Sequence, residues 1–174
     1  MSLASLVGLL LAAGTVQASA ADVPLADETR ASLALRARHG VHDPASPSTI
    51  YVHSDSSHYE TDEFTRVATR GSNGDWTIVS IGEETPGPVG PTGPTIVTAE
   101  TRRTLSAGEG EHLDRLLHWP PLYRQPSPRE REVGVGATFH TLEIVTPQGH
   151  AVFRWTGRLR GWAGAVADLI MGKG

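Results

Sequence analysis

Short stretches in which apolar and polar residues alternate fill the middle of the chain, and they constrain its fold most strongly. Alternation with a period of two separates the side chains onto the two faces of a β-strand. The alternating stretches are residues 49–53, 60–69 and 76–81, and residues 96–104 are a further expected strand. Residues 54–57 and 71–75, which separate the first three, are rich in Ser, Gly, Asn and Asp and have the composition of turns. We therefore expect an antiparallel meander.

A helix is predicted to follow the meander. Ser106 and Glu109 have the spacing of a capping box, in which the hydroxyl and the carboxylate each accept a hydrogen bond from a free backbone donor. The leucines after them recur at spacings that place them on one helix face. Two consecutive prolines would end this helix after Trp119.

A β-hairpin and a closing helix complete the predicted elements. Residues 137–146 and 150–156 are predicted to form the two strands of the hairpin. A two-residue Gln148-Gly149 turn would pair Glu143 with Arg154, whereas a type I turn with a glycine bulge would shift the pairing by one. Apolar residues at helical spacing over 161–171 predict an amphipathic helix too short to span a membrane.

Strands and helices are thus segregated along the chain, which favours the α+β class. We expect an antiparallel sheet of roughly five to six strands, with two helices packed on one face. Residues 27–38 fit either a short helix or a strand. The predicted organisation is a signal peptide over 1–20, an N-terminal extension over 21–47 that is irregular or a short helix, and a single α+β domain over 48–174.

The first 20 residues have the pattern of an export signal. An apolar run over residues 6–16 precedes Ala18-Ser19-Ala20, whose small side chains suit signal peptidase, so cleavage is expected after Ala20. The segment before the run carries no Lys or Arg, and the alternative is a buried N-terminal helix. The expected location is periplasmic or secreted, with no membrane span in the mature form.

Composition excludes several classes of function. The chain has no cysteine, which rules out disulfides, thiolate metal sites and cysteine nucleophiles. Its formal net charge of −4 lacks the basic excess of nucleic-acid-binding proteins, so no nucleic-acid partner is expected. No serine-nucleophile or cofactor motif is present in the sequence, so neither catalytic residues nor a cofactor are predicted.

The eight histidines are the most unusual polar feature. Their densest grouping contains His53, Asp55 and His58, which we name as a candidate metal site, because converging imidazoles and carboxylates bind zinc, copper or nickel. A tight turn between strands would be needed to bring the two rings together. The competing interpretation is a solvated hairpin tip.

These features predict an exported, non-catalytic binding or accessory protein with a protein partner in the cell envelope. One alternative is a periplasmic metal-binding protein that uses the His/Asp cluster. A second is a hydrolase whose active site is assembled from residues distant in the sequence and therefore carries no motif.

Overall fold

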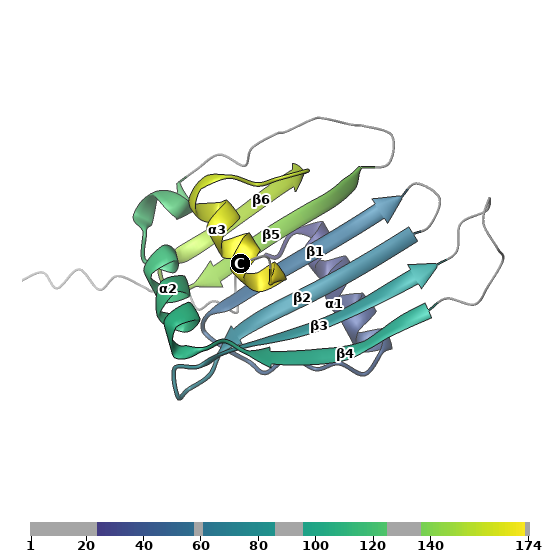
Figure 1. The fold of residues 1–174 in the computed structure, drawn as a ribbon, viewed down its shortest axis with the longest axis horizontal. Coiled ribbons are helices and arrows are strands. Elements are labelled where there is room, and N and C mark those ends of the chain that lie inside the picture. Colours follow the sequence, from purple (N-terminus) through teal and green to yellow (C-terminus); the bar gives the residue numbers. More distant parts are fainter. Residues whose placement is uncertain (1–23, 58–60, 86–95, 125–136, 173–174) are drawn as a thin grey trace, which may run out of the picture.

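The computed structural model describes residues 24–57, 61–85, 96–124 and 137–172. These residues form one six-stranded antiparallel sheet, with the strand order β4-β3-β2-β1-β5-β6, and three α-helices (Figure 1). The elements are α1 (Asp27–Arg38), β1 (Thr49–Ser57), β2 (Thr61–Arg70), β3 (Trp76–Thr85), β4 (Ile96–Thr104), α2 (Ala107–Leu117), the 3₁₀ helix η2 (Pro120–Tyr123), β5 (Thr138–Thr146), β6 (Gly149–Thr156) and α3 (Gly161–Met171). The predicted α+β class is confirmed.

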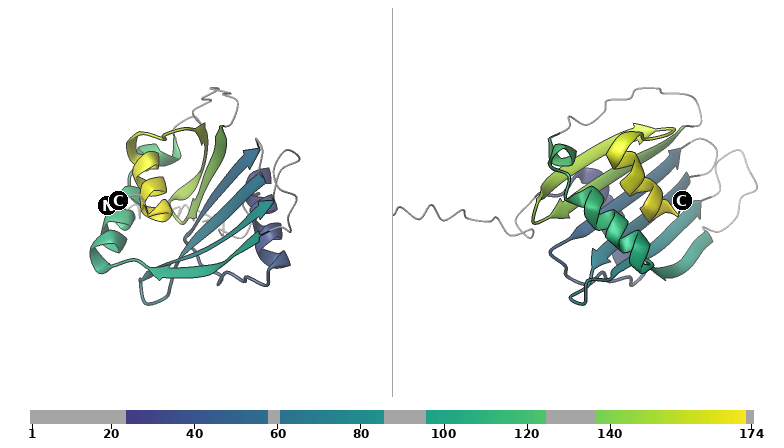
Figure 2. Two further views of the ribbon diagram at one scale, coloured as in Figure 1. Left: turned by 45° about the vertical axis from the view of Figure 1, so that its right-hand side comes forward. Right: turned by 60° about the vertical axis from the view of Figure 1, so that its left-hand side comes forward.

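The helices divide between the two faces of the curved sheet. Figure 2 shows α2 and α3 together over the concave face and α1 behind the sheet on the opposite face. The predicted pair of helices therefore corresponds to α2 and α3, and α1 is a third. No helix within the described ranges is long and apolar enough to cross a membrane.

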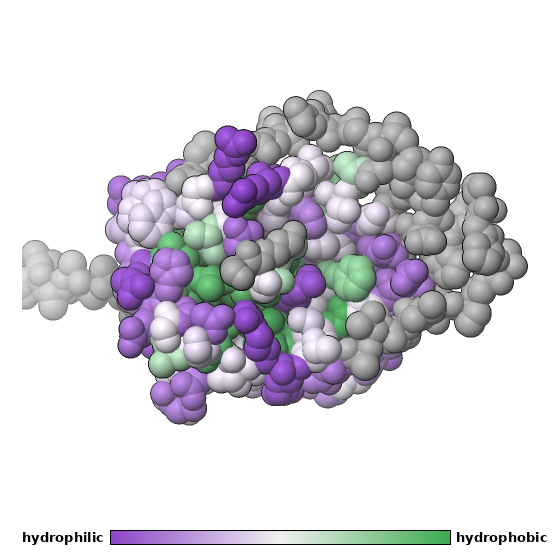
Figure 3. All heavy atoms as spheres, in the orientation of Figure 1, coloured by the Kyte–Doolittle hydropathy of each residue, from purple (hydrophilic) through white to green (hydrophobic). Residues whose placement is uncertain are grey.

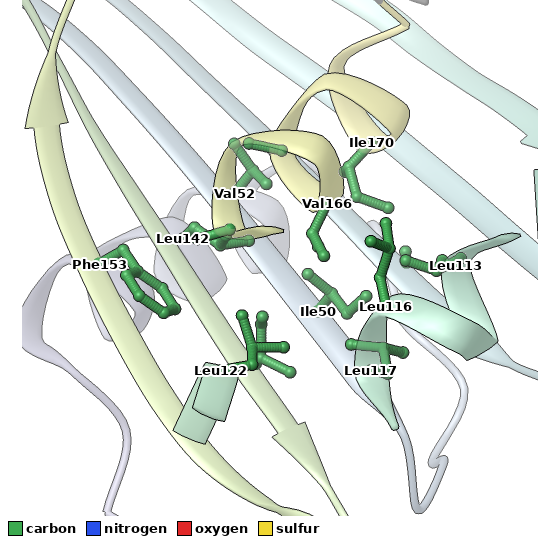
Figure 4. Packing of buried hydrophobic residues seen from close by; sticks show 14 of the residues in the cluster. Ile50, Val52, Leu113, Leu116, Leu117, Leu122, Leu142, Phe153, Val166 and Ile170 are labelled. Atoms are coloured by element: carbon green, nitrogen blue, oxygen red, sulfur yellow. The ribbon is translucent and has the colours of Figure 1, made fainter. Parts of the chain in front are cut away.

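The main hydrophobic core lies between the concave face and the helices α2 and α3. It takes side chains from the sheet and from the elements that cover this face, as Figure 4 shows. Members with at most 3% of their surface exposed include Ile50, Val52, Leu113, Leu116, Leu122, Leu142, Phe153, Val166 and Ile170. Each buried aliphatic or aromatic side chain of this kind contributes about 1.5–3 kcal/mol, so this layer supplies most of the driving force for folding.

The predicted capping box begins α2. The Ser106 hydroxyl accepts from the Glu109 amide, and the Glu109 carboxylate accepts from the Ser106 amide at 2.8 Å. Further along the helix, Asp114 accepts hydrogen bonds from the Arg70 guanidinium at 2.9 Å and from the Trp76 indole at 3.0 Å. The sequence therefore fixes the start of α2, and side-chain contacts hold the helix against the turn between β2 and β3.

The prediction of a turn over residues 54–57 is wrong, because β1 continues through Ser57. This strand is central and pairs along its length with both β2 and β5. Ser54 is buried, and its hydroxyl forms a 2.8 Å hydrogen bond with Nδ1 of His140 on β5. Pairing on both sides satisfies the backbone of this polar stretch, so its turn-like composition does not end the strand.

Both predicted registers of the final hairpin are wrong as well. Thr146 pairs with Gly149, so the connection is Pro147-Gln148, and Arg154 lies opposite Thr141 while Glu143 lies opposite Val152. The register differs by two residues from the simplest predicted one. Because strand side chains alternate with a period of two, a shift of two residues leaves the same side chains on each face of the hairpin.

Candidate functional site

The surface of α1 that meets the sheet is largely polar. Its buried residues are Thr29, Ser32, Leu35 and Arg36, of which only the leucine is apolar. The helix ends before Gly40, whose φ of +70° is the left-handed conformation common after helix C-termini. Packing of α1 against the sheet must therefore rely on hydrogen bonds and ion pairs more than on an apolar stripe.

Arg36 is the centre of these contacts and is only 1% exposed. Its Nε and Nη2 atoms donate to the two carboxylate oxygens of Asp43 at 2.7 and 2.5 Å. Its Nη1 donates to the Thr65 hydroxyl at 2.9 Å and to the Val79 carbonyl at 3.0 Å. One side chain thus joins α1 to β2, to β3 and to the loop that leads into β1.

Glu143 on β5 holds the other end of the helix, and its side chain is fully buried. Both carboxylate oxygens accept from the Ala26 amide, at 3.2 and 3.1 Å, and Oε1 also accepts from Nε2 of His150 at 2.6 Å. Ala26 immediately precedes the first turn of α1, where the helix dipole favours a negative charge. The buried carboxylate is thereby paired and hydrogen-bonded.

Ion pairs at the borders of α1 add to this attachment. Arg154 donates to both carboxylate oxygens of Glu28 at 2.6 and 2.8 Å, and this pairing lowers the pKa of Glu28. Glu83 accepts from His39 and from Arg38, and the hydrogen bond from His39 lowers the pKa of Glu83. Both carboxylates are consequently ionised over the whole neutral range.

A cavity of about 500 Å³ lies beside α1, between the helix, the following loop and the adjoining ends of β1 and β5. Its size falls within the range of about 300–1,000 Å³ that is usual for small-molecule sites. Its apolar lining consists of Leu25, Leu33, Ala37, Val41, Pro44, Ala45 and Val145. Its polar lining consists of Arg36, His42, Asp43, Ser46, Thr49 and Tyr51. Apolar walls with a few polar groups are the usual composition of a ligand-binding cavity.

The surroundings of Tyr51 define the protonation state of this lining residue. Burial, together with the nearby carboxylates of Asp43 and Glu143, raises the pKa of its phenol. The phenol is therefore neutral at physiological pH and is able to donate a hydrogen bond as well as accept one. Such a group can orient a ligand that carries a hydroxyl or a carbonyl oxygen.

Two of the three predicted metal-site residues, His53 and Asp55, lie on β1 outside this cavity. His53 is buried, its Nδ1 has no hydrogen-bond partner, and the Glu63 carboxylate lies 3.8 Å away. Asp55 is two residues further along the strand and so shares the face of His53. His58 lies outside the described residues, so the predicted triad remains a prediction. Within the described ranges, no group of three or more His, Asp or Glu side chains is arranged to hold a metal ion.

Sequence reasoning missed the cavity because its walls come from four segments that only the fold brings together. The one signal in the sequence was local. Arg36 and Asp43 are seven residues apart, with Gly40 between them, and a chain that turns at this glycine can bring the Asp43 carboxylate back to the arginine. No protein-family model matches this chain, and a search of curated proteins found no relative of it.

Proposed function

We propose that this chain is an exported binding protein that holds a small, largely apolar molecule in the cavity beside α1. The cavity is the observation that supports the proposal: about 500 Å³, mostly apolar walls, and a neutral phenol to orient the ligand. The charged lining residues Arg36 and Asp43 are paired with each other, which suits a ligand with one or two oxygen atoms rather than a charged one.

The hydrogen bonding of Asp43 and the raised pKa of Tyr51 favour ligand binding over catalysis in this cavity. Both carboxylate oxygens of Asp43 already accept hydrogen bonds from Arg36. The raised pKa of Tyr51 moves its phenol away from the neutral range in which a general base works best. These side chains are suited to position a bound molecule and are poorly suited to transfer its protons.

The attachment of α1 supports the same proposal. Arg36 and Glu143 fasten the two ends of the helix to the sheet through buried contacts. A wall held in this way is already ordered before the ligand arrives, which reduces the entropic cost of binding. The cavity therefore needs no large rearrangement to accept its ligand.

The neutral fluorescent probe N-phenyl-1-naphthylamine tests the site directly. Saturable binding is expected, with enhanced probe fluorescence. Ala37→Phe, which places a ring in the cavity, should weaken binding at least about tenfold, whereas Ala34→Phe on the same helix should not. Ala34 is the matched control because it is exposed and does not line the cavity. Equal affinities for the two variants, or no saturable binding, would refute this site.

Export is the second part of the proposal, and the leader-like residues 1–20 support it. Expression in a bacterial host with a periplasm should give a product in that compartment. Its intact mass should equal that of a chain that begins at Ala21. A product that retains Met1 and stays in the cytoplasm would contradict export while leaving the ligand site standing.

Metal binding is kept as a second candidate because of one observation, the buried Nδ1 of His53 that lacks a hydrogen-bond partner. A bound cation would satisfy this atom, with Asp55 and His58 as further ligands. Calorimetric titration with zinc, copper and nickel tests this candidate. Saturable binding that is lost in the double variant His53→Ala, His58→Ala would support it, and binding unchanged by the two substitutions would end it.

A further inference from the structure

A second hollow lies on the opposite, concave face of the sheet, past the C-terminal end of α3. We call it the β2–β4 groove, because its floor is formed by β2, β3 and β4, and its volume is about 420 Å³. Its apolar walls include Phe64, Ile78, Ile170 and Met171. Figure 3 shows hydrophobic surface on this part of the sheet, flanked by hydrophilic side chains.

Arg66 stands inside this groove in an unusual position. On β2 it lies between Phe64 and Ala68, and all three side chains are on the concave face. Its neighbours on the adjacent strands are Val52 and Ser80. The side chain is partly buried, and no side chain or carbonyl among the described residues makes an ion pair or hydrogen bond with it. Burial lowers the pKa of its guanidinium, because the charged form loses hydration.

A partly desolvated cation without a partner is unfavourable, and an anion would relieve that cost. The rest of the lining reinforces the preference for an anion. Arg103 adds a second guanidinium, which already donates to Glu109 at 3.2 Å and to the Leu169 carbonyl at 2.8 Å. Among the described residues, no acidic side chain lines the groove. The groove is therefore apolar and positively charged.

We propose that the β2–β4 groove binds a single acyl chain that ends in a carboxylate, with Arg66 pairing the head and the apolar walls covering the tail. This is a second site, independent of the cavity beside α1 and of the function proposed for it. A free fatty acid of short to medium length fits the modest volume.

The lining favours an acyl chain over a peptide. A peptide carboxylate would bring backbone amides against Phe64, Ile170 and Met171, whose side chains offer no hydrogen bonds, and each amide left without a partner carries a desolvation penalty. Among the described lining residues, the hydroxyls of Ser80 and Thr101 are the groups that could accept hydrogen bonds from such amides. Methylene groups have no such requirement.

The methyl group of Met171 provides a reporter inside the groove. The chain has only two methionines, so ¹³C-methyl labelling gives at most two resonances, and Met171→Leu identifies the one in question. Titration with dodecanoate below its micellar concentration should shift this resonance and give a one-site isotherm by calorimetry. Dodecanol should bind at least about tenfold more weakly, because it lacks the charge that pairs with Arg66.

Variants separate charge from volume. Arg66→Met should weaken dodecanoate binding to the level of dodecanol, and Ser80→Leu should weaken both ligands by filling the groove. Arg102→Met is the matched control, since Arg102 is an exposed arginine of β4 on the other face of the sheet. Its affinity for dodecanoate should be unchanged.

Several outcomes would overturn the proposal. Equal affinity for dodecanoate and dodecanol in the unaltered protein would do so without any variant. An apolar tripeptide with a free carboxylate that matches dodecanoate would assign the groove to peptides. Binding that appears only after removal of residues 173–174 would assign it to the end of the chain itself. A dodecanoate isotherm altered by Ala37→Phe and not by Arg66→Met would place the ligand in the other cavity.

Discussion

At the scale of single residues, Arg36 is the side chain on which the attachment of α1 depends most. Its guanidinium is buried and donates four hydrogen bonds, to Asp43, Thr65 and Val79. Arg36→Met removes the cation and leaves the Asp43 carboxylate and a buried carbonyl without their donor. Loss of one partner of a buried ion pair costs about 3–5 kcal/mol, so urea denaturation should give a free energy of unfolding lower by about that amount.

The matched substitution for this prediction is Arg38→Met, two residues along the same helix. Arg38 has 56% of its side chain exposed and its contact with Glu83 is 3.4 Å long. An exposed pair of this kind contributes about 0.2–1 kcal/mol, so the control should have a small effect. Similar losses for the two variants would mean that the guanidinium of Arg36 is not the anchor of the helix.

At the scale of elements, the start of α2 is set by its cap. Ser106→Ala removes the hydroxyl that accepts from the backbone of the first turn, and loss of such a cap typically costs about 1 kcal/mol. A urea midpoint reduced accordingly, with an unchanged slope, is the expected result. Ser72→Ala, in the exposed turn between β2 and β3, should leave the midpoint in place. Equal midpoints for both variants would argue against the cap.

The elements that could be predicted are those whose residues carry a local sequence pattern. The start of α2 is set by Ser106 and Glu109, which lie close together in the sequence, and the alternation of residue types predicts β2. By contrast, α1 turns Thr29, Ser32 and Arg36 toward the sheet, so no apolar helical stripe exists for periodicity to detect. The extension of β1 depends on two partner strands, which a local reading of serines cannot supply.

The candidate sites were harder to predict than the strands for a related reason. The cavity beside α1 is made by chain segments as far apart as Leu25 and Val145, and only tertiary packing brings them together. The groove did leave a signal in the sequence, because Arg66 occupies an inward position between Phe64 and Ala68 in an alternating strand. A charge at such a position needs a partner, and the sequence alone does not say whether the fold provides one.

At the scale of the whole molecule, the two layers that cover the sheet are held by different forces. The layer of α2 and α3 is held mainly by its apolar core, so protonation should affect it little, chiefly through the exposed Glu109 carboxylate of the α2 cap. The α1 layer is held by Arg36 and by carboxylates that include Glu28, Glu83 and Glu143. Acid should therefore weaken the α1 layer first.

Glu28 and Glu83 have pKa values below their ordinary 4.5, because of Arg154 and His39 respectively. Their contribution to stability is complete above about pH 4.5 and is lost as the pH falls through their lowered values. Glu63 behaves in the opposite way, because burial raises its pKa, so the folded protein takes up this proton first and gains stability on mild acidification.

A matched pair of substitutions tests these opposite signs. Glu28→Gln should lower the free energy of unfolding by about 0.2–1 kcal/mol at pH 7 and have no effect once the pH is well below the lowered pKa. Glu63→Gln should raise it at pH 7, because the cost of burying an ionised carboxylate is removed, and should steepen the loss between pH 7 and pH 3.5. Urea denaturation at several pH values measures both. If both variants have the same sign at pH 7, the carboxylates of the α1 layer do not control its response to acid in this way.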